Sequence, residues 1–213
     1  VRQKRVDYYT DAEASSNIQV LTVDQELPAK GDNPVVEARR FGDVSVTTVI
    51  AKFKKVKFET HESIGYGEVS VPQLELQTEA MWWTLREDLV KKYKERELEL
   101  SAALSGLANL LRTAVPVFVM CDQRDIGVTA MLRSRYDQRP TIYVWDRFAG
   151  GIGLSRRLFG MESRVLKACR DMATTCSCDS GCPGCVGPIL ASGQGARRAT
   201  VALLDDLLES SRK

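Results

Sequence analysis

Three features are missing or scarce in this sequence of 213 residues, and each bears on the class of protein or site. No G-x-x-x-x-G-K-[ST] motif occurs, so this segment does not bind and hydrolyse a nucleotide through a P-loop. The longest uninterrupted apolar stretch, residues 114–120, is far shorter than a membrane span, and we expect no membrane partner. The only histidine, His61, lies among acidic and hydroxyl side chains, and we assign it no chemistry.

Other absences bear on origin and compartment. The sequence has no low-complexity run, internal repeat or targeting segment, and we expect a cytoplasmic protein with reduced thiols. It starts at Val1 without an initiator methionine, so we expect a piece of something longer. Its 44% apolar content is enough for one good core or two small ones.

Cysteine is concentrated in one place. Gly181, Pro183 and Gly184 lie within this cysteine run and supply tight turns that would direct its sulfurs to one point. No large apolar side chain lies inside the run, so we expect a metal ion to hold it together. Four of the six cysteines form this C-x-C-x3-C-x2-C run: Cys176, Cys178, Cys182 and Cys185.

Three chemistries compete for these thiols. Disulfides between neighbours in the run would close very small, strained loops. An iron–sulfur cluster and a zinc ion both accept four thiolates, and an optical spectrum separates them because a zinc site is colourless. We favour zinc, in a structural site because all four ligand positions are filled. Cys121 and Cys169 stand apart in apolar contexts and are interpreted as buried thiols.

The periodicity of the sequence predicts an α+β fold. Residues 1–83 form a β-rich subregion, and residues 84–213 form an α/β layer with a four-cysteine zinc knot and a C-terminal helix. Met81, Trp82 and Trp83 are interpreted as core anchors. The predicted strands are 18–23, 44–58, 67–76, 115–121 and 141–145. The predicted helices are 84–111, 154–159, 163–173 and 196–209.

Basic residues are unevenly distributed. Residues 1–110 contain 15 basic and 18 acidic residues, whereas residues 111–213 contain 15 basic and 10 acidic ones. This excess is compatible with a nucleic-acid backbone and also with an ordinary solvated surface. In the first half, Lys54 and Lys55 belong to a lysine-rich strand around Phe53 and Phe58. Such a strand could track a nucleic acid, or it could be an edge strand that lysines protect from aggregation.

A glycine turn connects the 141–145 strand to the next helix. Gly150, Gly151 and Gly153 would let the backbone approach a ligand closely, and N–H groups at a helix start favour an anion. Arg156 and Arg157 gain nothing from the helix dipole there, which makes more sense beside a phosphate. The alternative is a turn required only for packing.

Three aspartates follow or end the strand candidates: Asp122, Asp125 and Asp146. If they converge, they form a carboxylate cluster that would bind Mg²⁺ or Mn²⁺ and cut nucleic acid. The alternative is that they cap helices and turns, or pair with Arg124 and Arg147.

The order of these motifs is similar to that in the C-terminal zinc-binding domain of the MrfA (YprA-like, mitomycin repair factor A) family of superfamily 2 DNA helicases. The resemblance covers nearly the whole chain. Residues 120–127, Asp146, residues 150–154 and the cysteine run carry it, and residues 6–10 and 52–55 match more weakly. Trp145 and Ala149 depart from the pattern, where tyrosine and proline are expected.

The resemblance implies an accessory part of an ATP-dependent 3′–5′ DNA helicase of DNA repair. Its metal ligands would be the four cysteines, and its partners would be DNA and the helicase motor domains of the same chain. A related domain also occurs in anti-phage defence proteins, so a defence helicase is an alternative, as is the nuclease. We expect an accessory module that contacts DNA through Gly150, Gly151, Gly153, Arg156, Arg157, Lys54 and Lys55.

Overall fold

The computed structural model describes residues 8–28, 35–58, 60, 62–68, 71–188, 193 and 195–209. Contacts between residues divide the chain into two units, which are described separately. Unit 1 comprises residues 1–17 and 46–76, and unit 2 comprises residues 18–45 and 77–213. A boundary between residues 83 and 84 stays a prediction.

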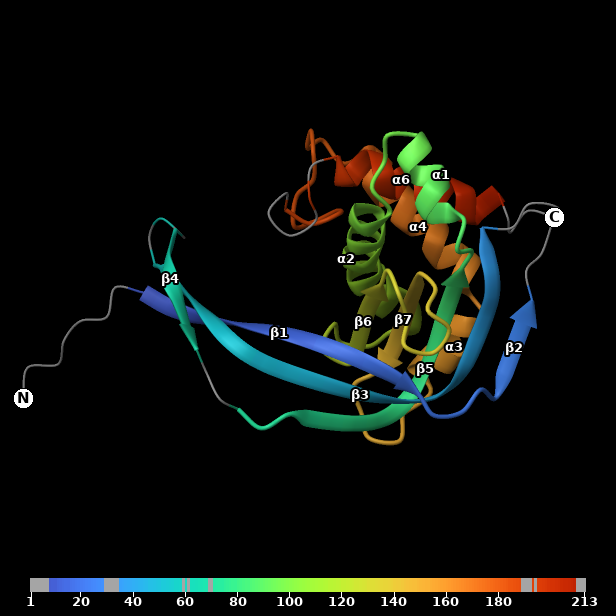
Figure 1. The fold of residues 1–213 in the computed structure, drawn as a ribbon, viewed down its shortest axis with the longest axis horizontal. Coiled ribbons are helices and arrows are strands. Elements are labelled where there is room, and N and C mark those ends of the chain that lie inside the picture. Colours follow the sequence, from blue (N-terminus) through green and yellow to red (C-terminus); the bar gives the residue numbers. More distant parts are fainter. Residues whose placement is uncertain are drawn as a thin grey trace, which may run out of the picture. The chain divides into compact units, whose positions relative to one another are not determined.

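Strands in the described residues form a sheet of seven (Figure 1). Their order is β1-β3-β5-β7-β6, and β2 and β4 also pair with β3. The pairings of β2 and β4 with β3, and of β5 and β6 with β7, are antiparallel. The strands are β1 (Tyr8–Val20), β2 (Gln25–Pro28), β3 (Val36–Lys57), β4 (Ser63–Glu68), β5 (Leu74–Leu85), β6 (Ile126–Met131) and β7 (Thr141–Asp146).

In unit 1, β3 and β4 form a ribbon whose side chains alternate between two faces. Lys54 lies opposite Tyr66, and Phe53 lies opposite Gly67. A Cβ atom on residue 67 would overlap the Phe53 ring, so the ring packs where only glycine leaves room. The lysine-rich stretch is therefore hydrogen-bonded to β4 on one side and is not a bare edge there.

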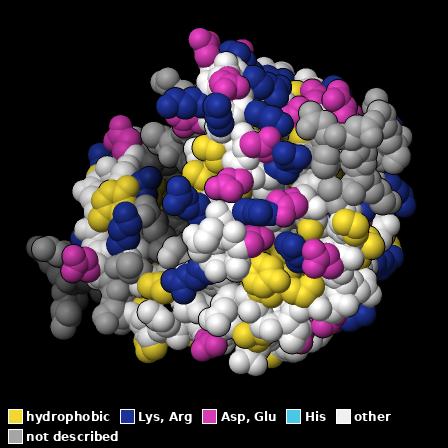
Figure 2. Space-filling model, turned by 45° about the vertical axis from the view of Figure 1, so that its right-hand side comes forward, with side chains coloured by type: hydrophobic (Ala, Val, Ile, Leu, Met, Phe, Trp, Pro, Cys, Tyr) yellow, Lys and Arg dark blue, Asp and Glu magenta, His cyan; other side chains and the backbone are white. Residues whose placement is uncertain are grey.

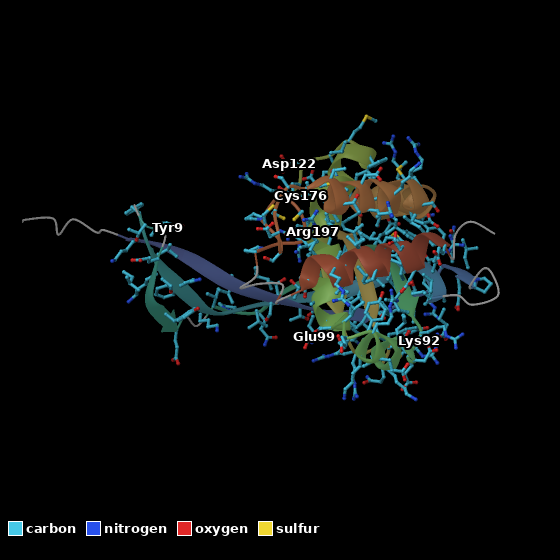
Figure 3. The ribbon with its side chains drawn as sticks, turned by 90° about the horizontal axis from the view of Figure 1, so that it is seen from above. Tyr9, Lys92, Glu99, Asp122, Cys176 and Arg197 are labelled. Atoms are coloured by element: carbon cyan, nitrogen blue, oxygen red, sulfur yellow. The ribbon has the colours of Figure 1, made fainter. Side chains whose placement is uncertain are left out.

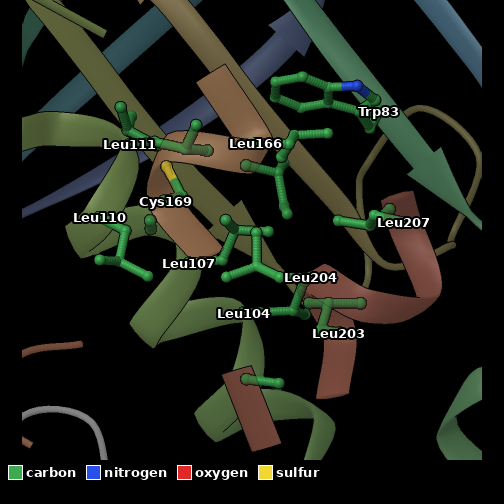
Figure 4. Close-up of a cluster of buried hydrophobic side chains, with 14 of the residues drawn as sticks. Trp83, Leu104, Leu107, Leu110, Leu111, Leu166, Cys169, Leu203, Leu204 and Leu207 are labelled. Carbon is green, nitrogen blue, oxygen red and sulfur yellow. The ribbon is translucent and has the colours of Figure 1, made fainter. Parts of the chain in front are cut away.

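In unit 2, helix α2 lies at the centre of the helical layer and contacts α4, α6 and β6. The core contains leucines of α2, α4 and α6 packed near Trp83 of β5 (Figure 4). Burial of these apolar side chains is the main favourable term in the stability of the unit. The helices of the described residues are α1 (Leu89–Glu95), α2 (Leu100–Val119), α3 (Leu154–Phe159), α4 (Glu162–Thr175) and α6 (Ala196–Glu209).

Helix α2 is unusually apolar. By length and composition alone its 20 residues could cross a membrane, but 67% of its most apolar window is buried inside the protein. Apart from the exposed Val117, its large apolar side chains belong to the core cluster shared with α4, α6 and β6 or pack against it. Packing within unit 2 therefore accounts for the apolar sequence of α2.

The structure corrects two predictions near residue 120. Residues 115–119, predicted as a strand, are the last turns of α2, because its buried positions continue through Pro116 to Val119. Met120 ends the helix in the left-handed conformation, with φ of 56°. Strand β6 was not predicted, because Gly127 interrupts its apolar pattern. That glycine is needed in the strand because a Cβ there would overlap the Trp145 ring on β7.

Other boundaries also move. The single strand predicted at 67–76 is wrong: this range contains the end of β4 and the start of β5, which lie on either side of Pro72. The helix predicted to start at residue 84 starts at Leu89, because β5 continues through Leu85. The strand predicted to start at residue 18 is part of β1, which begins at Tyr8. Trp82 and Trp83 are at most 2% exposed, so their role in the core is confirmed. The predictions at 141–145, 154–159, 163–173 and 196–209 are confirmed as β7, α3, α4 and α6, and the α+β class is confirmed.

We expect Gly106→Ala to lower the free energy of unfolding by about 1–3 kcal/mol, although alanine favours helix formation. The added Cβ would overlap Thr200 Oγ1 of α6 and lie 3.1 Å from Val186 Cβ. Urea denaturation measures the change. The double variant Gly106→Ala/Thr200→Ala should recover part of the loss, since it removes the hydroxyl. A single variant as stable as the parent would contradict tight packing between α2 and α6.

Candidate metal centre

Four cysteine sulfurs converge in unit 2. The Sγ atoms of Cys176, Cys178, Cys182 and Cys185 all lie within 4.8 Å of one another. Four of the separations are 3.4–3.6 Å. Tetrahedral coordination with a zinc–sulfur distance of about 2.3 Å places sulfurs about 3.8 Å apart, so the cluster matches a single ion.

The separations also decide between the competing chemistries. All six cysteines are free thiols, and the sulfurs of the cluster are too far apart for disulfide bonds of about 2.05 Å. A cluster with two or more irons would spread its cysteine ligands over different metal atoms, whereas these four sulfurs surround one point. The residues therefore fit a zinc ion, and four protein ligands leave no open position for catalysis.

The first two ligands follow the end of a helix. Helix α4 ends at Thr175, and Cys176 continues in extended conformation with φ of −63° and ψ of 132°. This change of direction turns the chain away from the helix axis and brings Cys178 back toward Cys176, with their sulfurs 3.5 Å apart.

The last two ligands lie on a tight turn. The N–H groups of Cys185 and Gly187 both donate to the Cys182 carbonyl, each at 3.0 Å. The Cys182 N–H points at the Cys185 sulfur, 3.3 Å away. Such N–H contacts stabilise a thiolate, which is the form that binds metal. Gly181 and Gly187 have φ of 136° and 93°, a region that favours glycine.

The cysteine run is anchored to the core at its second half. Cys185 and Val186 are 1% and 0% exposed and belong to the core cluster. The other three ligands are half-buried and pack against that cluster. The run itself contributes little apolar surface, so the core fixes one end of it and leaves the closing of the loop to the metal.

Two side chains outside the ligand set also hold the loop, and sequence analysis missed both. Arg197 of α6 donates to backbone carbonyls at the end of α4 and in the cysteine run, and it lies beside Cys176 in Figure 3. The Asn109 amide of α2 donates to the Pro183 and Cys185 carbonyls at 3.1 and 2.5 Å. A lone amide in an apolar helix was a signal for Asn109, whereas nothing in the sequence singles out Arg197.

The thiols share protons in the metal-free state. The Cys178 backbone N–H and the neighbouring thiols lower the pKa of Cys176 to about 7. Hydrogen bonds with the Cys185 and Cys176 thiols raise the pKa of Cys178 to about 12. Hydrogen bonds with the same two thiols also raise the pKa of Cys182. At neutral pH the metal-free loop therefore retains protons that a bound metal ion must displace.

The N–H groups of the glycine turn bind a carboxylate of the same chain. The buried Asp146 carboxylate accepts hydrogen bonds from the N–H groups of Ile152, Leu154 and Ser155, at 2.8, 3.0 and 2.8 Å. These are the amides at the start of α3 that the sequence predicts to bind a phosphate. In the folded chain they bind a carboxylate that β7 supplies.

The glycines of this turn have structural roles. Gly150, Gly151 and Gly153 have φ of 75°, 72° and 85°, which favour glycine. The N–H groups of Gly150 and Gly151 donate to the Gln77 and Phe148 carbonyls. Contact of the three glycines with nucleic acid stays a prediction, and it would not use these two amides.

The two arginines after the turn also contact the fold. Arg156 donates to Glu79 at 3.2 Å and stacks over the Phe41 ring at 4.5 Å. Arg157 donates to the Val119 carbonyl at 3.3 Å, where α2 ends. Their predicted contacts with DNA would be made in addition to these structural ones.

The three aspartates do not gather around a metal. Asp122 Oδ1 accepts the Arg124 N–H at 2.8 Å, and Asp125 Oδ2 accepts the Asp122 N–H at 2.9 Å, so both stabilise a local turn. Asp146 is committed to the start of α3. In the part of the chain that the structure describes, the four cysteines are the one group of three or more potential ligands that meets. The capping interpretation of the aspartates is supported, and a nuclease centre is not.

The predicted lysine contacts lie in unit 1, on the ribbon of β3 and β4. Lys52 lies 5.1 Å from the centroid of the Tyr66 ring, and Lys55 lies 5.9 Å from that of Phe53. Lys54 faces the same side as Tyr66, its partner on β4. Each face of this ribbon therefore carries lysine together with an aromatic ring.

Comparisons with known proteins identify relatives. A sequence family described as "MZB: MrfA Zn-binding domain" matches residues 107–186. "Uncharacterized ATP-dependent helicase YprA" of Bacillus subtilis (strain 168) is 34% identical over 210 residues, which are 97% of this chain and 26% of YprA. "Uncharacterized protein MJ1572.1" of Methanocaldococcus jannaschii is 28% identical over 74 residues, 33% of this chain and 66% of that protein.

Solved structures of MrfA helicases are also similar to this chain. A crystal structure of the DUF1998 helicase MrfA bound to DNA shares 33% identity and a TM-score of 0.66, covering 96% of this chain and 26% of that one. A crystal structure described only as that of the DUF1998 helicase MrfA shares 27% identity and a TM-score of 0.60, covering 91% and 24%. This chain therefore spans about a quarter of the length of these helicases.

We expect Cys182→Ser to lose bound zinc and to lower the free energy of unfolding by at least about 3 kcal/mol, because metal binding energy here is folding energy. Elemental analysis and thermal melting measure the two effects. The control is Cys121→Ser, whose thiol lies outside the cluster and should leave the zinc content unchanged. A Cys182→Ser protein that melts like the control would contradict stapling by a metal.

Zinc retention should weaken as pH falls. Protons compete with zinc for thiolates, and the raised pKa values of Cys178 and Cys182 make that competition strong even near neutral pH. Apparent affinity should drop up to about tenfold per displaced proton for each pH unit. Competition with a chromophoric chelator between about pH 8 and pH 5 measures this, and a flat profile would contradict thiolate ligation.

Proposed function

We propose that this chain is the C-terminal accessory domain of an ATP-dependent 3′–5′ DNA helicase of DNA repair, because residues 107–186 match the MrfA zinc-binding domain family. It would contact DNA, the helicase motor domains of the same protein, or both, in the cytoplasm. The observation that carries the proposal is the four-cysteine zinc site, in a fold that matches a DNA-bound MrfA helicase over 96% of this chain.

In this role the zinc site is structural. No P-loop occurs in the sequence, so ATP hydrolysis would be supplied by the remaining three quarters of a helicase of YprA length. The domain would contribute a rigid surface, because four ligands on one ion fix a loop that has little apolar surface of its own.

Contact with DNA would be made most directly by the ribbon of unit 1. Its lysines suit phosphates. The exposed aromatic side chains of Tyr66 on β4 and of Phe58, directly after β3, are 55% and 56% exposed and suit stacking on unpaired bases. Elsewhere, on the face shown in Figure 2, Lys and Arg side chains lie among Asp and Glu side chains. Mixed charge of that kind gives less attraction to a phosphate backbone than a basic ribbon does.

We expect Lys54→Gln/Lys55→Gln to weaken binding to single-stranded DNA and to reduce the salt dependence of log K by about 1.4, for two lost phosphate contacts. Fluorescence anisotropy between about 50 and 200 mM salt measures both quantities. These lysines are a cleaner test than Arg156 and Arg157, whose removal would break hydrogen bonds to Glu79 and to the Val119 carbonyl.

The control is Lys91→Gln/Lys94→Gln, which removes the same charge from exposed positions of α1. If both double variants lose affinity equally, net charge alone explains binding and the ribbon has no special role. If the parent chain binds no DNA even at low salt, the domain would act through the motor domains instead.

A further inference from the structure

We propose that Arg197 is a positioning residue for the zinc site, holding the Cys176–Cys178 half of the loop and offsetting the charge of the metal–thiolate centre. The guanidinium Nε donates to the Ala173 carbonyl at 2.9 Å. One terminal nitrogen donates to the carbonyls of Thr174 and Cys176, at 3.2 and 2.7 Å. The other donates to the Cys178 carbonyl.

These four carbonyls join a helix end to two metal ligands. Ala173 and Thr174 lie in the last turn of α4, where carbonyls have no partner within the helix. Cys176 and Cys178 are the first two ligands. One side chain from α6 thus fixes both the direction in which α4 ends and the backbone from which two sulfurs project.

The positive charge of Arg197 is favourable here for two reasons. The carboxyl end of α4 carries the negative pole of the helix dipole, and a cation there is stabilising. A divalent ion with four thiolates carries a net double negative charge, which a nearby cation also offsets. Partners of this kind, outside the ligand set, typically change metal affinity by about 10- to 100-fold.

Lysine cannot reproduce the arrangement. A guanidinium has five N–H donors in a fixed planar fork, and four contacts here use three nitrogen atoms. An ammonium group keeps the charge but is a single point, so it cannot reach four separate carbonyls at once.

The other half of the loop provides a neutral counterpart. Asn109 from α2 donates to the Pro183 and Cys185 carbonyls and carries no charge. Side chains from two helices therefore hold the loop. The Cys182–Cys185 side is held by neutral hydrogen bonds from α2, and the Cys176–Cys178 side by hydrogen bonds from a charged group on α6.

Zinc affinity, measured by competition with a chromophoric chelator, tests the proposal in the full chain. Arg197→Gln should bind zinc about 100-fold more weakly, and Arg197→Lys about 10-fold more weakly, because lysine restores the charge without the fork. The matched control is Arg198→Gln, the next residue on α6, which is exposed and, within the described part of the chain, donates to the Arg96 carbonyl at 3.5 Å. It should bind zinc like the parent.

The spectrum of the Co²⁺-substituted protein supplies a second measurement, because its visible d–d bands report the geometry of the ligands and not global stability. These bands should shift in both Arg197 variants and not in Arg198→Gln. Equal losses of affinity in the Gln and Lys variants would overturn the role of charge. Parent-like affinity and bands in Arg197→Lys would overturn the positioning role, even if Arg197→Gln failed to fold.

Discussion

Close packing of α2 against α6 is the constraint on which the rest of unit 2 depends. Gly106 has no side chain to hold the helices apart, so Thr200 of α6 and Val186, which directly follows the cysteine run, approach the α2 backbone. That approach brings Asn109 and Arg197, from two different helices, within hydrogen-bond distance of one loop. The hydrophobic core and the metal site are therefore a single arrangement, because one contact between helices places both.

The glycine turn shows how a motif suited to ligands can serve the fold. Positive φ angles, N–H groups at a helix start and a positive dipole pole are what an anion site requires. The chain meets that requirement with Asp146, which the antiparallel pairing of β6 and β7 fixes at the end of the sheet beside α3. The carboxylate locks the crossing from strand to helix, and the arginines that follow join this region to Glu79 and Val119.

The metal ligands could be predicted because they are neighbours in sequence, so spacing alone brings four thiols together. Long amphipathic helices such as α6 were predictable for the same local reason. Strand β6 was not, because Gly127 is explained only by the Trp145 ring on another strand. The end of α2 was mistaken for a strand because a short apolar run has no periodicity of its own. Arg197 was missed since its partners are more than 18 residues away in sequence.

The position of Arg197 has a consequence for the order of events during synthesis. Translation delivers Asn109 first, then the four cysteines, and Arg197 only after the last of them. A nascent chain that has just exposed its thiols has the α2 grip on the loop but lacks the one from α6. Capture of the ion at full strength must therefore wait until α6 has also emerged from the ribosome, and until then the thiols are incompletely held and open to oxidation.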